Sequence, residues 1–302
     1  MSEMKQNAFG TAWAKTILLG EHAVVHGGTA VAMSLDITVR VNAIRKEGPL
    51  SLLFTDSNHR VVAGDGSPSE KAISALVEAL SLRPEGFHLE VVCNFPNRAG
   101  LGSSAAIAAA VARALVVLQG LSCSDADLFR AVQASEKVFH GNPSGIDATV
   151  ALHGGILTYS KSRGMIPVDA IPPEVLIVYS GDPGDTSTTV ERFAHQLQRE
   201  PEESKFRLEA IETIVEKGIA ALISGDLKTL GQAMYENHRH LAWFRVSSLS
   251  LDRIVEIAGE ADALGAKLTG GGGGGCAVIL KPERPEQLVQ KLNAAGFRVV
   301  VS

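Results

Sequence analysis

Hydrophobic and polar residues alternate along residues 36–44, which is the pattern of a β-strand with one buried face. The alternation predicts Ile37, Val39 and Val41 on the buried face and Thr38, Arg40 and Asn42 on the exposed face. Similar reasoning predicts strands over 50–55 and 87–95 and a helix over 69–82. Glu47-Gly48-Pro49 is expected to form a turn before the second strand. The first part of the chain therefore mixes sheet and helix.

Helical periodicity dominates from Gly100 onward. An alanine-rich helix is predicted from Gly100 to about Gln119, and a second, capped within 124–127, to about Phe139. Residues 160–173 break the periodicity with charged residues and prolines, so they are the best candidate for a domain boundary. We therefore expect an N-terminal ATP- and substrate-binding domain of residues 1–165 and a C-terminal domain of residues 166–302.

The C-terminal part is expected to combine helices with short apolar strands. The predicted strands are 174–180, 277–280 and 298–301, and the predicted helices are 188–198, 204–224, 226–242, 250–264 and 286–295. These elements follow one another without regular β-α-β alternation. The pattern therefore favours an α+β fold in both halves over a single doubly wound sheet.

Composition narrows the class of protein. The 302 residues are 45% hydrophobic and 20% charged, which excludes disorder as the main state. A formal net charge of −5 supplies no excess of cations, so no nucleic acid partner is expected.

No targeting or membrane-spanning segment is recognisable in the sequence. The N-terminus lacks the basic start and apolar run of a signal peptide, and the longest apolar stretch, 105–118, is shorter than the ~20 residues of a spanning helix. Cys93, Cys123 and Cys276 form no C-x-x-C pair, so we expect three buried thiols rather than disulfides or a zinc site. The sequence thus predicts a cytoplasmic protein with no membrane partner.

The most informative segment is P-N-R-A-G-L-G-S-S-A-A, residues 96–106, where a strand gives way to a helix. Glycines and serines at a helix N-terminus present free N–H groups, which favours binding of a phosphate. An ordinary glycine turn capped by Ser103 or Ser104 is the plain alternative. A Walker loop is excluded around Lys15 because both of its glycines are missing. A dinucleotide-binding loop stays open, although no acidic residue ends a second strand ~20 residues later.

Three further segments are unusual, two because of the positions of their polar groups and one because of its run of glycines. Lys15, Glu21 and His22 interrupt an apolar run over 12–28, so each must leave the core or find a partner within it. Glu136 and Asp147 are two carboxylates that would suit phosphoryl transfer, one holding Mg²⁺ and one orienting the acceptor hydroxyl, or are simply a surface and a turn residue.

The last of these segments is a run of six glycines that follows K-L-T, within residues 267–276. Glycine runs are often flexible linkers between polar segments. This one precedes an apolar strand, which favours close approach of its backbone to a ligand.

Taken together, these segments resemble the kinase superfamily that includes galactokinase, homoserine kinase, mevalonate kinase and phosphomevalonate kinase. Within it, the chain is most similar to the mevalonate kinases. The similarity rests on K-T-I-L-L-G-E-H-A-V-V-H-G from Lys15, on Glu136 with H-G-N-P-S-G-I-D, on S-T-T-V from Ser187, and on N-H-R-H-L from Asn237.

The resemblance implies an α+β N-terminal half like a ribosomal-protein domain and a ferredoxin-like C-terminal half. It also implies ATP- and Mg²⁺-dependent phosphorylation of the C5 hydroxyl of mevalonate, a step of isoprenoid precursor synthesis, and it allows a homodimer. Other small alcohols, such as phosphomevalonate, a sugar or an amino alcohol, are the alternative acceptors. A catalytically silent ligand sensor and a dinucleotide-dependent oxidoreductase are more distant alternatives.

The family pattern also implies roles for individual residues. Asp147 would be the base, and Lys15 would lower the pKa of the acceptor hydroxyl. Ser104 and Glu136 would hold Mg²⁺, while Glu21, His22 and Ser144 would line the acceptor pocket with Lys15 and Asp147. The nucleotide would be bound by the glycine run, chiefly Gly271 and Gly272, and by Pro96, Asn97, Arg98, Ala99, Gly100, Leu101, Gly102, Ser103, Ser104, Ala105 and Ala106.

The chain departs from the family pattern at three places. Trp13-Ala14 precedes Lys15 where Pro-Gly is usual, and Arg98 replaces a small residue in the phosphate loop. Leu241-Ala242-Trp243-Phe244-Arg245-Val246 replaces an aliphatic stretch. These changes leave phosphoryl transfer in place but bear on which acceptor is used.

Overall fold

The computed structural model describes residues 6–93, 99–141, 143–184 and 186–301. The chain divides into two compact units that are interleaved along the sequence. Unit 1 consists of Met1–Lys15, Leu35–Phe95 and Gly102–Gly154, and unit 2 of Thr16–Ser34, Pro96–Leu101 and Gly155–Ser302. The linear division at residue 165 remains a prediction beside this interleaved arrangement.

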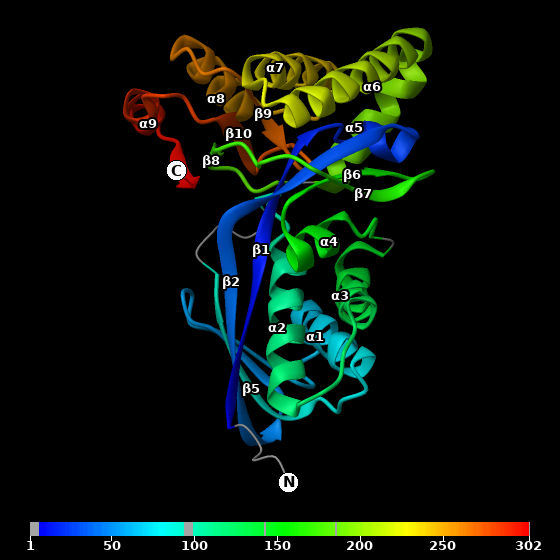
Figure 1. Cartoon of the computed structure of the whole chain (residues 1–302), viewed down its shortest axis with the longest axis vertical. Coiled ribbons are helices and arrows are strands. Elements are labelled where there is room, and N and C mark those ends of the chain that lie inside the picture. Colours follow the sequence, from blue (N-terminus) through cyan, green and yellow to red (C-terminus); the bar gives the residue numbers. More distant parts are fainter. Residues whose placement is uncertain (1–5, 94–98, 142, 185, 302) are drawn as a thin grey trace. The chain divides into compact units, whose positions relative to one another are not determined.

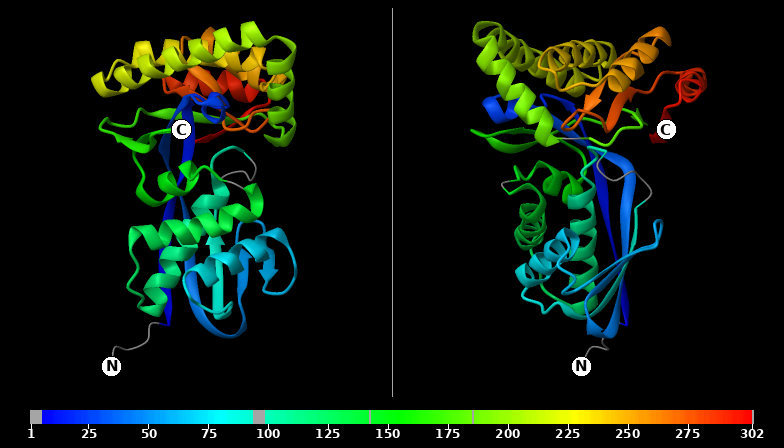
Figure 2. Two further views of the ribbon diagram at one scale, coloured as in Figure 1. Left: turned by 90° about the vertical axis from the view of Figure 1, so that its right-hand side faces the viewer. Right: turned by 180° about the vertical axis from the view of Figure 1, so that it is seen from behind.

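Unit 1 is a sheet with helices packed on one of its faces, as Figures 1 and 2 show. The strands occur in the order β4-β3-β5-β2, and β1 pairs with β2. Their bounds are β1 Asn7–Leu19, β2 Thr29–Pro49, β3 Ser51–Phe54, β4 His59–Val62 and β5 Glu85–Val92. The helices are α1 Pro68–Ala79, α2 Ser103–Gln119, α3 Asp125–His140 and α4 Ile146–His153.

Helix α2 is the centre of unit 1 because its many alanines let other backbone approach it closely. Every alanine of the helix is buried. On β1, a Cβ added to Gly10 would lie only 2.0 Å from the carbonyl oxygen of Ala110. This backbone-to-backbone contact fixes where α2 lies against the sheet, and with it the position of the helix N-terminus.

Unit 2 contains two groups of strands and a layer of helices (Figure 1). Strand β6 (Ile156–Ser160) pairs with residues 29–33 of β2 and with β7 (Gly164–Val168). The second sheet is antiparallel in the order β11-β8-β10-β9. Its bounds are β8 Val175–Tyr179, β9 Ala266–Thr269, β10 Cys276–Leu280 and β11 Arg298–Val301.

Helices α7 and α8 pack against β9, and the fully buried strand β10 lies at the middle of the second sheet. The helical elements of unit 2 are the 3-10 turn η1 Ala23–His26 and the helices α5 Thr186–Arg199, α6 Pro201–Ser224, α7 Leu227–Trp243, α8 Leu249–Glu260 and α9 Pro285–Ala294. No helix among the residues that the structure describes is long and apolar enough to cross a membrane. The expected α+β class is confirmed.

Most predicted elements are present. Several errors lie in segments where glycine or proline residues predicted the end of a strand. Glu47-Gly48-Pro49 is not a free turn but the end of β2, where Pro49 still pairs with Glu85 after an irregularity in the ladder. Strand β7, paired with β6 as a hairpin, was not predicted within residues 160–173; the domain boundary in this segment remains a prediction. Strand β4 and helix α4 were not predicted.

Two further predictions are wrong. The helix predicted over 250–264 ends at Glu260, because Asp262 adopts a left-handed conformation with φ 55°. Ala266 then begins β9, which is buried along its whole length. Cys123 is only partly buried, unlike Cys93 and Cys276.

Candidate active site

Unit 1 brings Lys15 of β1 and Asp147 of α4 together as an ion pair. The Lys15 Nζ lies 3.3 Å from the Asp147 Oδ1, and the lysine side chain is almost fully buried whereas that of Asp147 is one-third exposed. Asp147 stands in the first turn of α4, where the helix dipole favours a carboxylate. A desolvated cation thus faces a carboxylate that solvent, or a substrate, can reach.

Gly102 allows this pair to lie against the N-terminus of α2. Its φ of +68° is in the left-handed region, and it forms the N-cap of the helix. A Cβ at this position would be 2.9 Å from Cγ of Lys15 and 3.5 Å from Oδ2 of Asp147. Glycine is therefore required for the ion pair and the free N–H groups of α2 to share one location.

Glu136, near the end of α3, belongs to the same cluster. The Ser104 hydroxyl donates a hydrogen bond to its carboxylate, and His140 Nε2 lies 3.8 Å from its Oε2. Burial raises the pKa of Glu136 to about 7; the negative charge of Asp147 adds to this rise, while Ser104 and Lys15 oppose it. Its Oε1 is buried without a hydrogen-bond partner among the described residues.

These two side chains fit a Mg²⁺ ion. Mg²⁺ prefers oxygen ligands and is usually held by one or two protein groups together with water and phosphate oxygens. Ser104 and Glu136 offer a hydroxyl and a carboxylate, and the unpartnered Oε1 gives a buried acceptor with no other use. Within the described parts of the chain, no three His, Cys, Asp or Glu side chains gather as an all-protein metal site.

Ser144 lies at the start of α4, three residues before Asp147. It is exposed, and its hydroxyl accepts a hydrogen bond from the Ile146 N–H at 3.3 Å. The intervening Gly145 has φ +89°, and a Cβ there would be 3.0 Å from the Phe129 ring. The turn is thus held by local packing, with the serine hydroxyl left on the surface.

In unit 2, the polar residues that follow β1 find buried partners. Glu21 forms a fully buried ion pair with Lys267 of β9, whose ammonium also donates to the Leu268 carbonyl at 2.6 Å. Asn237 of α7 accepts a hydrogen bond from the Gly20 N–H at 3.0 Å, which fixes the start of this turn. Lys267 and Asn237 stand in motifs recognised in the sequence, but neither was given a role there, although a lysine within a buried strand signals a specific partner.

His22 adopts a left-handed backbone conformation with φ 59° and is largely buried. Its Nε2 is 3.0 Å from the carbonyl oxygen of Gly271. Burial lowers the pKa of the imidazole, and the nearby His26 and Lys267 lower it further, while the bond to Gly271 acts in the opposite direction. Its surroundings therefore favour the neutral form of the imidazole beside the glycine run.

The six glycines between β9 and β10 form a packed connection rather than a linker. Residues 99 and 100 of the predicted phosphate loop lie directly on it: a Cβ on Gly100 would be 2.8 Å from the Thr269 carbonyl oxygen, and one on Gly275 would be 3.1 Å from that of Ala99. A Cβ on Gly272 would be 2.0 Å from the Val246 carbonyl oxygen. Only glycine fits these close approaches.

The predicted site residues thus fall into two groups. Unit 1 brings together Lys15, Gly102, Ser104, Glu136 and Asp147, with Ser103, Ala105 and Ala106 in the first turn of α2. Unit 2 brings His22 to Gly271, and Ala99 and Gly100 to the glycine run, and it also contains Leu101. Pro96, Asn97 and Arg98 lie outside the described residues.

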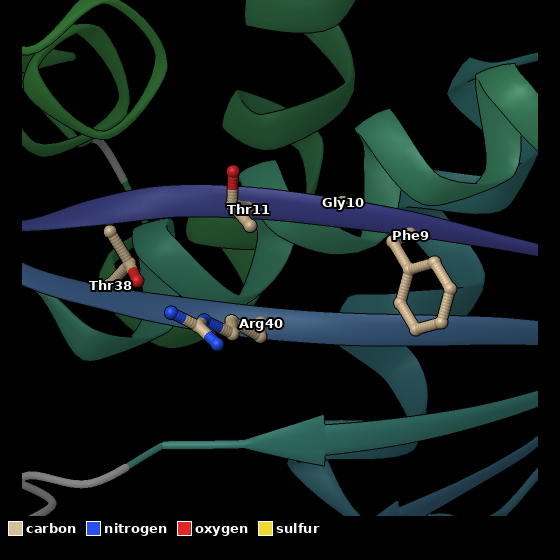
Figure 3. A pocket seen from close by; sticks show the side chains of 5 residues that line it. All are labelled: Phe9, Gly10, Thr11, Thr38 and Arg40. Atoms are coloured by element: carbon tan, nitrogen blue, oxygen red, sulfur yellow. The ribbon is translucent and has the colours of Figure 1, made fainter.

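A surface hollow of unit 1 lies apart from this cluster. It is on the outer side of β1 and β2 and has a volume of about 450 Å³ (Figure 3). Its lining consists of Phe9, Gly10, Thr11, Thr38 and Arg40, none of which is a predicted site residue.

Comparisons with known proteins agree with this geometry. The family model described as GHMP kinases N terminal domain matches residues 69–155, and the one described as GHMP kinases C terminal matches residues 219–298. A mevalonate kinase of Thermococcus sibiricus is 32% identical, over 96% of this chain and 93% of its own.

Solved structures show the same fold. The L. major mevalonate kinase in complex with R-mevalonate is 29% identical, with a TM-score of 0.84 over 97% of this chain and 94% of its own. The Methanococcus jannaschii mevalonate kinase is 26% identical, with a TM-score of 0.85 over 96% of each chain. The expected two-part fold is confirmed, and these similarities favour neither a dinucleotide-dependent oxidoreductase nor a silent sensor.

Proposed function

The chain belongs to the GHMP kinase family, and on that premise we propose that it transfers the terminal phosphoryl group of ATP to the C5 hydroxyl of mevalonate. The products are 5-phosphomevalonate and ADP. The observation that carries the proposal is the Lys15–Asp147 ion pair at the N-terminus of α2, since it combines a base and a cation with a phosphate-binding helix end. Mevalonate is the favoured acceptor because the relatives described above are mevalonate kinases.

In this reaction Asp147 takes the proton of the acceptor hydroxyl as the oxygen attacks the terminal phosphorus of ATP. Its partial exposure leaves room for the hydroxyl beside the carboxylate. The buried charge of Lys15, 3.3 Å away, favours the ionised hydroxyl and offsets negative charge on the transferring phosphoryl group. General-base assistance of this kind contributes roughly 10²–10⁴-fold to a rate.

The phosphates are held by backbone rather than by side chains. The loop 96–106 leads into α2, whose first N–H groups point out of the helix toward an anion. Residues 270–275 pack on Ala99 and Gly100 of that loop and close over the phosphates beside it. Protein catalysis of phosphoryl transfer consists mainly of such positioning and charge stabilisation.

Ser104 and Glu136 hold Mg²⁺ in this proposal. When bound, Mg²⁺ neutralises charge on the phosphate oxygens. Glu136 must be ionised to bind the cation, and its unpartnered Oε1 is the atom left for this purpose. Ser104 keeps the carboxylate in place through its hydrogen bond.

Glu21, His22 and Ser144 line the acceptor pocket in this proposal. Ser144 presents an exposed hydroxyl close in sequence to Asp147. Glu21 acts from within its buried ion pair with Lys267, which fixes the backbone that carries His22. A charged residue held this firmly orients its neighbours at no further cost in side-chain entropy on binding.

The test is coupled ADP release from Mg-ATP with mevalonate, phosphomevalonate, homoserine, galactose or no acceptor. We expect turnover with mevalonate alone. Turnover only with another member of the panel would retain the kinase and replace the acceptor. Silence with every acceptor would contradict the proposal.

Asp147→Asn is the decisive variant for the assignment of the base. We expect it to lower kcat by about 10²-fold or more, since the amide cannot take the proton. Binding of ATP, followed by calorimetry, should be retained. Turnover near the wild-type level would show that another group is the base. Asp169→Asn, in the segment that follows β7, is the control that should leave kcat unchanged.

A cytoplasmic location and a homodimer complete the proposal. Both rest on the sequence and on the family resemblance alone. Sedimentation of the purified protein tests the dimer, and fractionation of the source cells tests the location.

A further inference from the structure

The carbonyl oxygen of Gly271 accepts two hydrogen bonds from segments far apart in the sequence. His22 Nε2 lies 3.0 Å from it, and the Thr189 hydroxyl of α5 donates to it at 2.7 Å. Thr189 is fully buried. The turn after β1, helix α5 and the glycine run therefore meet at one atom of unit 2.

This junction determines which nitrogen of His22 carries the proton. A carbonyl oxygen can only accept, so His22 Nε2 must be the protonated nitrogen. The neutral ring then has a lone pair on Nδ1, and Nδ1 has no hydrogen-bond partner among the residues that the structure describes. The imidazole can therefore accept a hydrogen bond at Nδ1.

An aromatic stack fixes the plane of the same ring. Phe193, one turn after Thr189 on α5, stacks on His22 with ring centres 5.3 Å apart and planes 15° apart. Phe193 is itself buried and stacks on Phe244 at 4.1 Å, and Trp243 meets Phe244 edge-on. Such stacked pairs favour one relative orientation of the rings. The aromatic residues of the segment 241–246 therefore support His22 through Phe193.

The junction holds His22 in a strained backbone conformation. A left-handed residue other than glycine costs on the order of 1–2 kcal/mol and persists only where its surroundings hold it. Here one helix supplies both the hydrogen-bond partner of the shared carbonyl and the stacking ring. A simple turn would require neither.

We propose that Thr189 and Phe193 are positioning residues, which hold His22 with its proton on Nε2 so that Nδ1 accepts a hydrogen bond from a hydroxyl group of the acceptor. A ring nitrogen that accepts a hydrogen bond selects for a hydroxyl group at this point of the pocket. It selects against an ionised carboxylate, because a carboxylate has no proton to donate. This inference rests on the proposed function only in the identity of the acceptor.

The first test measures the tautomer without reference to activity. Long-range ¹H–¹⁵N correlation spectra at pH 8, with His22→Asn used to assign the signal, should show His22 protonated on Nε2 only. Addition of mevalonate should then shift the Nδ1 resonance. Protonation on Nδ1, or on both nitrogens, overturns the inference whatever the enzyme does. An Nδ1 resonance that saturating acceptor leaves unchanged also overturns it.

The second test is a set of variants at Thr189. Loss of one buried hydrogen bond should raise KM for mevalonate by about tenfold in Thr189→Val, with kcat and KM for ATP within about twofold of wild type. Thr189→Ser keeps the hydroxyl and should restore KM. Thr213→Val removes an exposed hydroxyl that also donates to a backbone carbonyl, and it is the matched control. An effect confined to KM for ATP would assign Thr189 to the phosphate loop and overturn the inference.

A double-mutant cycle separates positioning from general damage. If Thr189 and Phe193 act through His22, then Thr189→Val and Phe193→Leu should have no further effect on KM for the acceptor in a His22→Asn background. Additive losses would mean that they act independently of His22. If the acceptor panel selects another alcohol, the same cycle is measured with that alcohol, so failure of the proposed substrate and failure of this inference are distinguishable.

Discussion

At the scale of single residues, several charged side chains at the candidate site are buried, and burial of a charge costs free energy of folding. Glu136 is a buried carboxylate whose ordinary ionised state is disfavoured, and Lys15 and Lys267 are buried ammonium groups that depend on single carboxylate partners. Such positions lower stability unless the charge is paired. Their presence in one chain is the sign of groups kept for binding or chemistry.

Glu136→Gln is expected to stabilise the metal-free protein while it removes activity. The carboxyl has a pKa of about 7 in the folded chain and 4.5 as its model value, so the folded state binds the extra proton between these values and loses stability as the pH rises. The variant should therefore match wild type near pH 4. At pH 8 it should exceed the wild-type free energy of unfolding by about 2–3 kcal/mol.

Urea unfolding without Mg²⁺ at both pH values checks this prediction. Glu216→Gln, at an exposed position on α6, is the control and should show no such pH dependence. A stability difference that is equal at pH 4 and pH 8 would show that the carboxylate is not destabilised by its burial.

Lys267→Met tests the buried ion pair of unit 2. Removal of one partner leaves the Glu21 carboxylate buried, which typically costs about 3–5 kcal/mol. The double variant Lys267→Met with Glu21→Leu should be more stable than Lys267→Met alone, because neither charge of this pair is then left buried. Denaturant unfolding of the three proteins measures this, and equal stability of the single and double variants would contradict the pairing.

At the scale of elements, packing decides where the N-terminus of α2 lies. The helix is rich in alanine, and the backbone of β1 rests on it at Gly10 without an intervening side chain. The loop before α2 is likewise seated on the glycine run at Gly100. Small residues thus position the phosphate-binding elements by allowing backbones to touch.

Gly10→Ala should destabilise the protein although alanine has the better strand and helix propensities. The new methyl group would overlap the Ala110 carbonyl oxygen, and a backbone cannot move aside as a flexible side chain can. Overpacking of this kind costs typically 1–3 kcal/mol. Gly64→Ala is a control in open space, although its own positive φ costs something. Thermal unfolding that ranks the two variants equally would contradict this account.

At the scale of the whole molecule, residues proposed for one reaction come from both compact units. In the proposal, unit 1 contains the base Asp147, the cation Lys15 and the metal ligands Ser104 and Glu136, and unit 2 contains His22 and the glycine run. Ligands that bind only the folded chain stabilise it, by about 2.7 kcal/mol at a concentration of 100 times Kd.

Mg-ATP should therefore raise the thermal midpoint, and excess EDTA should remove most of the increase. Asp147→Asn should keep the shift, because its role is in proton transfer. Glu136→Gln should lose the part that depends on Mg²⁺. Scanning fluorimetry measures all of these, and a shift that survives EDTA unchanged would contradict metal-assisted binding of the nucleotide.

The sequence by itself determined which segments are the candidates to carry chemistry. The phosphate loop, the carboxylates Glu136 and Asp147, and the glycine run were recognisable because local rules govern them: helix N-termini bind anions, and glycine permits close approach. Most helices were found for the same reason, since their periodicity is a local property. For Lys15, the sequence indicated only that the side chain must leave the core or find a partner within it.

Tertiary structure alone decided which groups meet. Glu21 and Lys267 are 246 residues apart, and the Thr189–Gly271 contact spans 82 residues, so no local pattern could reveal either pair. The end of β2 and strand β7 were missed because cross-strand pairing overrides the local preferences of glycine and proline. The local sequence determines which functional side chains each segment carries. Long-range packing determines the protonation, burial and orientation of those side chains.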